Sequence, residues 1–129
     1  MIAVDTNIVI RLLTGDHPNQ SVQAMHLFNT QDILLPTTVL LEAFWVLRKR
    51  FNQPQAEILR QFDALTRLPR VTVADTQGFA IALSLSKAGM SFADAMHLAS
   101  VKAGQKFATF DADLIRIAQN HGVEGVFAP

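Results

Sequence analysis

The chain has 129 residues, of which 50% are hydrophobic and 17% are charged. A chain of this length can bury a proper core, so we expect one domain over residues 1–129. Eleven Lys and Arg balance eleven Asp and Glu, which argues against binding nucleic acid through bulk positive charge alone. The absence of cysteine excludes disulfides and thiolate metal sites.

The first residues do not resemble a signal peptide, because Asp5 interrupts the apolar run that such a peptide needs. The longest fully apolar runs, residues 43–47 and 79–83, are too short to cross a bilayer. We therefore expect a soluble, cytoplasmic protein. The mean hydropathy of +0.23 is a weak indication that a partner covers some apolar surface.

The first third of the chain predicts strand, helix, helix and strand. A short apolar run at residues 1–4 predicts a buried strand that ends at Asp5, with a helix over 6–13 directly behind it. A second helix is expected over 19–29, with Val22, Met25 and Leu27 or Phe28 on its inward side. Residues 33–36 predict a second short strand.

The middle of the chain is mostly helical. Thr37 and Thr38 are expected to cap a long helix that runs to about Phe51 and is apolar on almost every side. A further helix is expected from about residue 54 to residue 68, a third strand at 71–73, and a helix over 75–88.

The last third begins with a capping-box pattern, Ser91 to Asp94, that opens a helix carrying apolar residues to Val101 and closed by Gly104. A fourth strand is expected at 106–109, a helix from Asp111 to about Asn120, and an edge strand within 123–127. Strands that alternate with helices predict an α/β fold with a mostly parallel sheet.

Five acidic side chains fall at strand ends or in the first turns of helices: Asp5, Glu42, Asp94, Asp111 and Asp113. Several have simpler explanations, since Asp5, Asp94 and Asp111 suit helix capping and Asp113 suits the helix dipole. Glu42 is harder to explain in this way, because apolar residues flank it and buried carboxylates are rare unless they are paired.

The five acids are more informative as a set. Residues that follow parallel strands emerge at one edge of the sheet, where α/β proteins bind their ligands. Crowded carboxylates without matching Lys or Arg repel one another, and a divalent cation relieves that repulsion. Oxygen ligands favour Mg²⁺ or Mn²⁺ over zinc. The residues therefore indicate a metal-dependent phosphodiesterase or nuclease that uses a metal-activated water.

With these positions in hand, the sequence resembles the PIN-domain ribonucleases, and within them the VapC-type toxins of bacterial toxin–antitoxin pairs. The resemblance covers the whole chain. It is carried by Val4-Asp5-Thr6-Asn7 and by three further segments, at residues 40–47, 91–99 and 108–114. It implies a compact sandwich with a central five-stranded parallel sheet flanked by helices, and endonucleolytic cleavage of RNA at an acidic pocket that binds Mg²⁺ or Mn²⁺.

The resemblance also implies roles for particular residues. Asp5, Glu42 and Asp94 match the first three acids of the family. The fourth falls between Thr109 and Asp113, where we favour Asp111, with Asp113 as a close second that binds a second metal or orients water. The small polar residues that support the pocket are Thr6, Asn7 and Thr109.

Partners follow from the resemblance as well. It implies a homodimer built largely from the helices after the second strand, and a cognate antitoxin that covers the remaining apolar groove. Phe44 and Trp45 suit either interface better than base stacking. The RNA target, with transfer RNA and ribosomal RNA both known in the family, cannot be inferred from these residues.

Other readings remain open. His97 lies one turn after Asp94 but suits a supporting or core position better than a hard-ion site. The basic residues 48–50 could contact phosphates or simply suit a helix C-terminus. A receiver-like phosphoacceptor also places an Asp at a strand end, but Asp5 lacks a paired acid and Lys106 begins its strand. A non-catalytic partner-binding domain is the third reading, although all five acids are intact.

Overall fold

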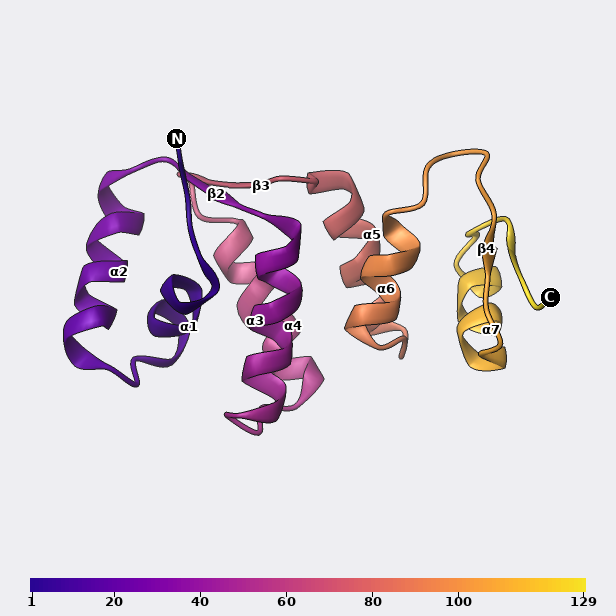
Figure 1. Ribbon diagram of the computed structural model, residues 1–129, viewed down its shortest axis with the longest axis horizontal. Helices are drawn as coiled ribbons and strands as arrows, with labels where there is room; N and C mark the ends of the chain where they lie inside the picture. The colour runs from indigo at the N-terminus through magenta and orange to yellow at the C-terminus, as the bar shows by residue number, and fades with distance from the viewer. The chain divides into compact units, whose positions relative to one another are not determined.

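A computed structural model describes residues 1–129, and the chain divides into two compact units, Met1–Thr76 and Gln77–Pro129 (Figure 1). The first unit contains three strands and four helices. Their bounds are β1 Ile2–Ala3, α1 Thr6–Thr14, α2 Pro18–Thr30, β2 Ile33–Leu35, α3 Thr37–Lys49, α4 Gln55–Thr66 and β3 Val71–Val73.

The sheet of the first unit is parallel, with strand order β1-β2-β3. Ile33 of the central strand lies opposite Ile2 on one side and Val71 on the other. Ile33 and Leu35 are fully buried, as a β-branched and apolar central strand should be. Because β1 and β2 are parallel, their carboxyl ends lie at the same edge.

The core of the first unit lies between this sheet and its helices. α1 packs against both α2 and α3, and α3 packs against α4. Leu40, Leu47 and Ile58 are fully buried there. The rings of Phe44 and Phe62 meet edge to face, with centroids 6.3 Å apart, an arrangement that aromatic quadrupoles favour.

The second unit begins inside α5 and contains a two-stranded parallel sheet. The bounds are α5 Thr76–Lys87, α6 Phe92–Ala99, β4 Phe107–Ala108, α7 Ala112–Asn120 and β5 Val126–Phe127. Ala108 of β4 lies opposite Phe127 of β5. Phe79 of α5 and Phe92 of α6 pack edge to face with centroids 6.4 Å apart, and both side chains are buried.

The α/β class and the parallel strands predicted from the sequence are confirmed. The five strands appear at the expected places, but they are divided between a three-stranded and a two-stranded sheet. This differs from the single five-stranded sheet that the resemblance implied. None of the seven helices combines the length and the apolar character that a membrane-spanning helix requires.

Several local predictions are wrong. The first strand was expected to be buried, but both residues of β1 are exposed. Pro36, and not a threonine, stands at the N-cap of α3, with no side-chain cap. α6 ends at Ala99, because the N–H of Val101 bonds to the Leu98 carbonyl three residues back and no longer to a carbonyl four residues back. Val22 and Met25 of α2 are exposed, by 67% and 54%, because Ala24 and Phe28 form the buried face of that helix.

Candidate functional site

Asp5 follows β1 at the carboxyl edge of the first sheet and is the N-cap residue of α1. Its backbone is extended, with φ −82° and ψ 164°, and its Oδ1 accepts a hydrogen bond of 2.7 Å from the Thr6 N–H. Val4 before it is buried, whereas Asp5 itself is exposed. The cap therefore fixes the carboxylate through one oxygen and leaves Oδ2 for another partner.

The two polar residues after Asp5 face different surroundings. Thr6 is buried, with 5% of its surface exposed, and Asn7 is exposed. Asn7 lines a groove of about 450 Å³ between α1 and α2, together with Arg11, Gln20 and Gln23. The groove thus begins two residues after the Asp5 carboxylate.

Glu42 lies on α3, which follows β2 from the same sheet edge. Its apolar neighbours in the sequence predict a buried side chain, but the side chain of Glu42 is exposed. The reason is the phase of the helix: Leu40, Ala43 and Leu47 recur at three- and four-residue spacing and take the core face. Glu42 and Trp45, three residues apart, share the outer face.

Asp94 lies in the first turn of α6, and Ser91 caps that helix. The Ser91 hydroxyl accepts a hydrogen bond of 3.2 Å from the Asp94 N–H, which is one half of the predicted capping box. The reciprocal bond from the Ser91 N–H to the Asp94 carboxylate is not seen. The half-buried Asp94 carboxylate is therefore not used by the cap.

Asp111 caps α7 at the end of the segment that follows β4. Its Oδ1 accepts a hydrogen bond of 3.1 Å from the Leu114 N–H. Its own N–H donates to the hydroxyl of Thr109 at 3.1 Å, and the Thr109 N–H donates to the Phe127 carbonyl of β5 at 2.9 Å. Thr109 thus supports Asp111 by holding its backbone to the sheet.

Asp113 differs from Asp111 in having a cationic partner. Its Oδ1 lies 3.4 Å from an Nη atom of Arg116, one turn further along α7, and both side chains are largely exposed. None of the ion pairs in the molecule involves Asp5, Glu42, Asp94 or Asp111. Four of the five acids are therefore uncompensated by Lys or Arg.

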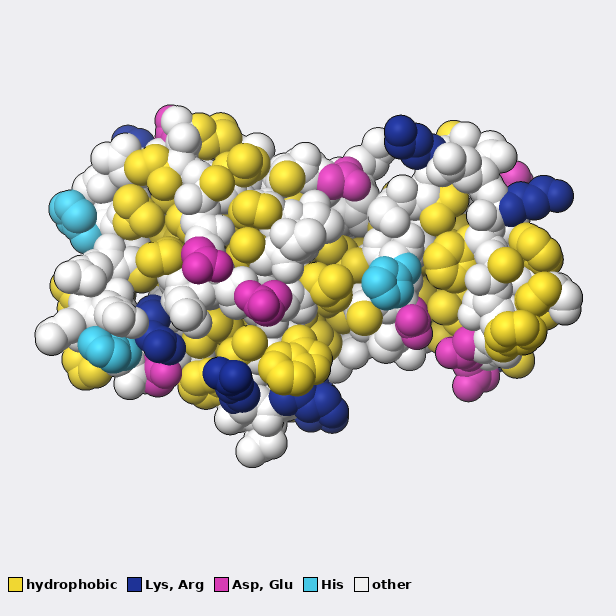
Figure 2. Space-filling model, viewed as in Figure 1, with side chains coloured by type: hydrophobic (Ala, Val, Ile, Leu, Met, Phe, Trp, Pro, Cys, Tyr) yellow, Lys and Arg dark blue, Asp and Glu magenta, His cyan; other side chains and the backbone are white.

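Four of the five acids lie at helix starts or just after strands, and Glu42 lies in the second turn of α3. In the second unit, β4 runs opposite to α6 and α7, so the beginnings of both helices lie at the end where β4 finishes (Figure 1). Figure 2 shows exposed acidic side chains over α1 and α3 of the first unit and near those helix beginnings in the second. No group of three or more His, Cys, Asp or Glu side chains is close enough to hold a metal ion.

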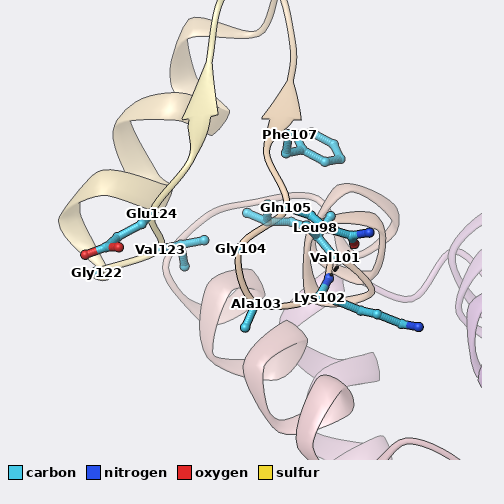
Figure 3. A pocket seen from close by; sticks show the side chains of 10 residues that line it. All are labelled: Leu98, Val101, Lys102, Ala103, Gly104, Gln105, Phe107, Gly122, Val123 and Glu124. Carbon is cyan, nitrogen blue, oxygen red and sulfur yellow. Dashed lines mark hydrogen bonds between the residues drawn. The ribbon is translucent and has the colours of Figure 1, made fainter.

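Other residues weighed in the sequence lie on the surface. His97 is exposed on α6, and Arg48, Lys49 and Arg50 are exposed at the end of α3. A pocket of about 340 Å³ in the second unit is lined by the loop after α6 and the loop between α7 and β5 (Figure 3). The charged residues that line this pocket are Lys102 and Glu124, and none of the five candidate acids lines it.

An exposed Phe is the feature of this site that the sequence reasoning missed. Phe110 lies between Thr109 and Asp111, and 89% of its surface is exposed. Its position inside the motif was visible in the sequence, but a lone Phe after a strand is more often a core residue.

An α/β fold with parallel strands and uncompensated carboxylates at strand ends and helix starts defines a class of protein suited to hard cations and phosphate ligands. Within that class, residues 2–120 match the PIN domain. The chain therefore belongs to the PIN domain family, whose members are typically nucleases that act on nucleic acid with divalent metals. A comparison with curated proteins finds no match.

Proposed function

We propose that this PIN-domain protein is an endoribonuclease that hydrolyses RNA phosphodiesters with Mg²⁺ or Mn²⁺. The observation that carries the proposal is the family match over residues 2–120, which includes all five candidate acids. Asp5, Asp94, Asp111 and Asp113 lie just after a strand or in the first turn of a helix, where α/β proteins bind ligands.

We also propose that the two units act as one nuclease domain over residues 1–129. The family match runs through the boundary at Thr76 and Gln77 without a break. Asp5 and Glu42 lie before this boundary, and Asp94, Asp111 and Asp113 lie after it. Each unit alone therefore carries only part of the proposed donor set.

The chemistry of the proposed donors suits a hard divalent cation, because every candidate ligand is a carboxylate oxygen and four of the acids have no Lys or Arg partner. The proposed ligands are Asp5, Glu42, Asp94 and Asp111, with Asp113 in a second position because Arg116 competes for it. A bound cation supplies Lewis acidity, which lowers the pKa of water and offsets phosphate charge.

The residues around the acids orient them. The Thr6 N–H holds one oxygen of Asp5, and the Leu114 N–H holds one oxygen of Asp111, so that both carboxylates are fixed before any ligand arrives. Each of these carboxylates therefore loses little conformational freedom when it binds a ligand. Thr109 acts through Asp111, as a positioning residue.

The finer biological role that we propose is that of a toxin of a toxin–antitoxin pair. Exposed apolar side chains support a partner: Val22 and Met25 on α2, and Trp45 on α3. We assign the exposed surface around Trp45, in the second half of α3, to a homodimer and the apolar surface of α2 to a cognate antitoxin. Light scattering on the purified chain, alone and with the product of the adjacent gene, tests both assignments.

The test of the enzyme activity is cleavage of RNA by the purified chain. With Mg²⁺ or Mn²⁺ present, we expect cleavage of RNA, and EDTA should stop it. Asp94→Asn should abolish cleavage and leave the circular dichroism spectrum intact. Wild-type cleavage rates in EDTA or in Asp94→Asn would contradict the metal-dependent mechanism. Sequencing the cleaved ends after brief expression would identify the RNA, with transfer and ribosomal RNA as the first candidates.

A further inference from the structure

Phe110 is the most exposed large hydrophobic side chain of the molecule, with 89% of its surface accessible. Burial of a Phe ring is among the larger favourable contributions to folding, and this ring contributes almost none of it. Single exposed apolar residues are ordinary on protein surfaces. Phe110 differs from the other exposed apolar residues in combining a backbone that is hydrogen-bonded on both sides with aromatic and acidic residues near it.

The backbone on both sides of Phe110 is fixed. The Thr109 N–H donates to the Phe127 carbonyl, which ties the residue before Phe110 to β5. The Asp111 N–H donates to the Thr109 hydroxyl, and the Asp111 carboxylate caps α7. The ring is therefore presented to solvent by an ordered segment that joins a strand to a helix, and not by a loose loop.

A second aromatic ring lies at the same end of this sheet. Phe127 is 43% exposed, and it lies opposite Ala108 in the β4–β5 pairing. Phe110 follows Ala108 by two residues. The strand end that carries Asp111 thus exposes aromatic surface beside acidic groups, and Figure 2 shows hydrophobic and acidic side chains adjoining where β4 leads into α7.

The charges here limit how an RNA could be held. Asp111 and Asp113 repel phosphates, and Arg116, the one cation of α7, is paired with Asp113. The chain as a whole has no net charge to attract a polyanion. Stacking of a base on an aromatic ring needs no charge and tolerates any base, so it can supply binding where Coulomb attraction cannot.

We propose that Phe110 is a stacking platform for one unpaired base of the RNA substrate, and that it holds the adjoining phosphodiester beside Asp111. The inference rests on the proposed ribonuclease function and restricts the substrate to single-stranded segments of RNA. A base inside a duplex is stacked between its neighbours and does not expose its face to a protein side chain.

The experiment compares Phe110→Ala, Phe110→Leu and Phe110→Trp with the wild-type protein on a single-stranded oligoribonucleotide with Mn²⁺. Ile81→Ala is the matched control, since Ile81 is an exposed apolar residue of α5 to which no role is assigned. Loss of one stacked base should raise KM about tenfold in Phe110→Ala, with kcat nearly unchanged because ground-state and transition-state binding weaken together. Phe110→Trp should keep the wild-type KM because its ring can still stack on a base, whereas Phe110→Leu should raise KM.

An abasic nucleotide placed in turn along the oligoribonucleotide identifies the stacked base. At one position, the abasic substitution should raise the KM of the wild-type protein by as much as Phe110→Ala does, and combining the two changes should add nothing further. A 2-aminopurine at that position should be quenched on binding to the wild-type protein and not to Phe110→Ala.

Several results would overturn the inference. If the wild-type protein cleaves RNA and Phe110→Ala has the same KM, stacking fails while the ribonuclease function stands. If Phe110→Leu has the same KM as Phe110→Trp and the wild-type protein, the side chain acts only as apolar surface, as it would in a contact with another protein. A wild-type protein that neither binds nor cleaves the oligonucleotides would overturn the stacking and the proposed function together.

Discussion

Asp5 has two separable tasks at the residue scale, capping α1 and binding the proposed cation. Asn caps a helix about as well as Asp does, so Asp5→Asn should keep the thermal stability and lose cleavage. Asp5→Ala should lose cleavage and also about 1 kcal/mol of stability, the usual cost of removing an N-cap. Thermal unfolding and RNA cleavage, measured on the same preparations, separate the two tasks. Cleavage by Asp5→Asn at the wild-type rate would mean that the charge of Asp5 is not needed.

The division of labour between Asp111 and Asp113 can be tested in the same way. Asp111→Asn keeps the cap of α7 but should reduce kcat on the order of 100-fold, as when a group that stabilises transition-state charge is lost. Asp113→Asn should have a smaller effect, because Arg116 already compensates Asp113. Neither change should alter stability much, since exposed ion pairs contribute about 0–1 kcal/mol. The reverse order of effects would make Asp113 the fourth acid.

Among single residues, the helix caps could be predicted from the sequence, because they depend only on neighbouring residues. Ser91 and Asp111 cap helices as expected, because a cap needs only a side chain and the next few N–H groups. The exposure of Glu42 and Phe110 was not predictable in this way. Exposure depends on which face of an element meets the core, and for Phe110 no periodic pattern indicates that face.

At the scale of elements, the junction of α1 and α2 contains a small polar network. Gly15 ends α1 with φ 65°, where a side chain would be strained. The Thr14 hydroxyl donates to Asp16 at 2.8 Å, and Arg11 donates to both oxygens of the same carboxylate. The hydrogen bond from Thr14, with a further contribution from the charge of Arg11, lowers the pKa of Asp16 below its usual value of 3.8.

This lowered pKa predicts a dependence of stability on pH. Asp16 binds protons less readily when the chain is folded, so it stabilises the fold above pH 3.8 and loses that contribution as the pH falls through its folded-state pKa. Asp16→Asn should lower the melting temperature slightly at neutral pH and not at all below the folded-state pKa. Melting curves of both proteins across this range provide the test, and a constant difference would contradict the linkage. Thr14→Val should move the pKa of Asp16 upward in an NMR titration.

The elements themselves were predicted well where hydrophobic periodicity and breakers agree, as at β2, α3 and β3. Predictions failed where tertiary packing decides. Ala24 and Phe28 take the core face of α2, although Val22 and Met25 are equally apolar in sequence. The end of α6 was missed because Val101 is apolar and extends the pattern past the actual stop at Ala99.

At the scale of the whole molecule, a cation that binds the folded chain and not the unfolded chain should stabilise the fold. Mn²⁺ at a hundred times its Kd should add about 2.7 kcal/mol to the free energy of unfolding. Mn²⁺ should therefore raise the melting temperature of the wild-type protein. This rise should disappear in Asp5→Asn of the first unit and equally in Asp94→Asn of the second. If only one of the two substitutions removes it, the cation is held by a single unit. Lys87→Gln, exposed in α5, is a matched control.

How the strands combine into sheets was beyond the sequence. Strand positions follow from apolar runs, but strand partners are chosen by contacts between residues far apart in the chain. Here Ile2, Ile33 and Val71 combine in one sheet, and Phe107 and Val126 in another. The family match over residues 2–120 confirms the PIN-domain resemblance that the four short segments carry.

The exposure of Trp45 has an optical consequence. The chain contains one tryptophan and no tyrosine, so its near-ultraviolet fluorescence comes almost entirely from a single indole on the outer face of α3, 55% of whose surface is exposed. Emission from an indole in water should shift to shorter wavelengths when a second copy of the chain covers α3. A dilution series of the unlabelled protein would therefore report self-association directly, and an emission maximum that does not change with concentration would argue that α3 stays uncovered.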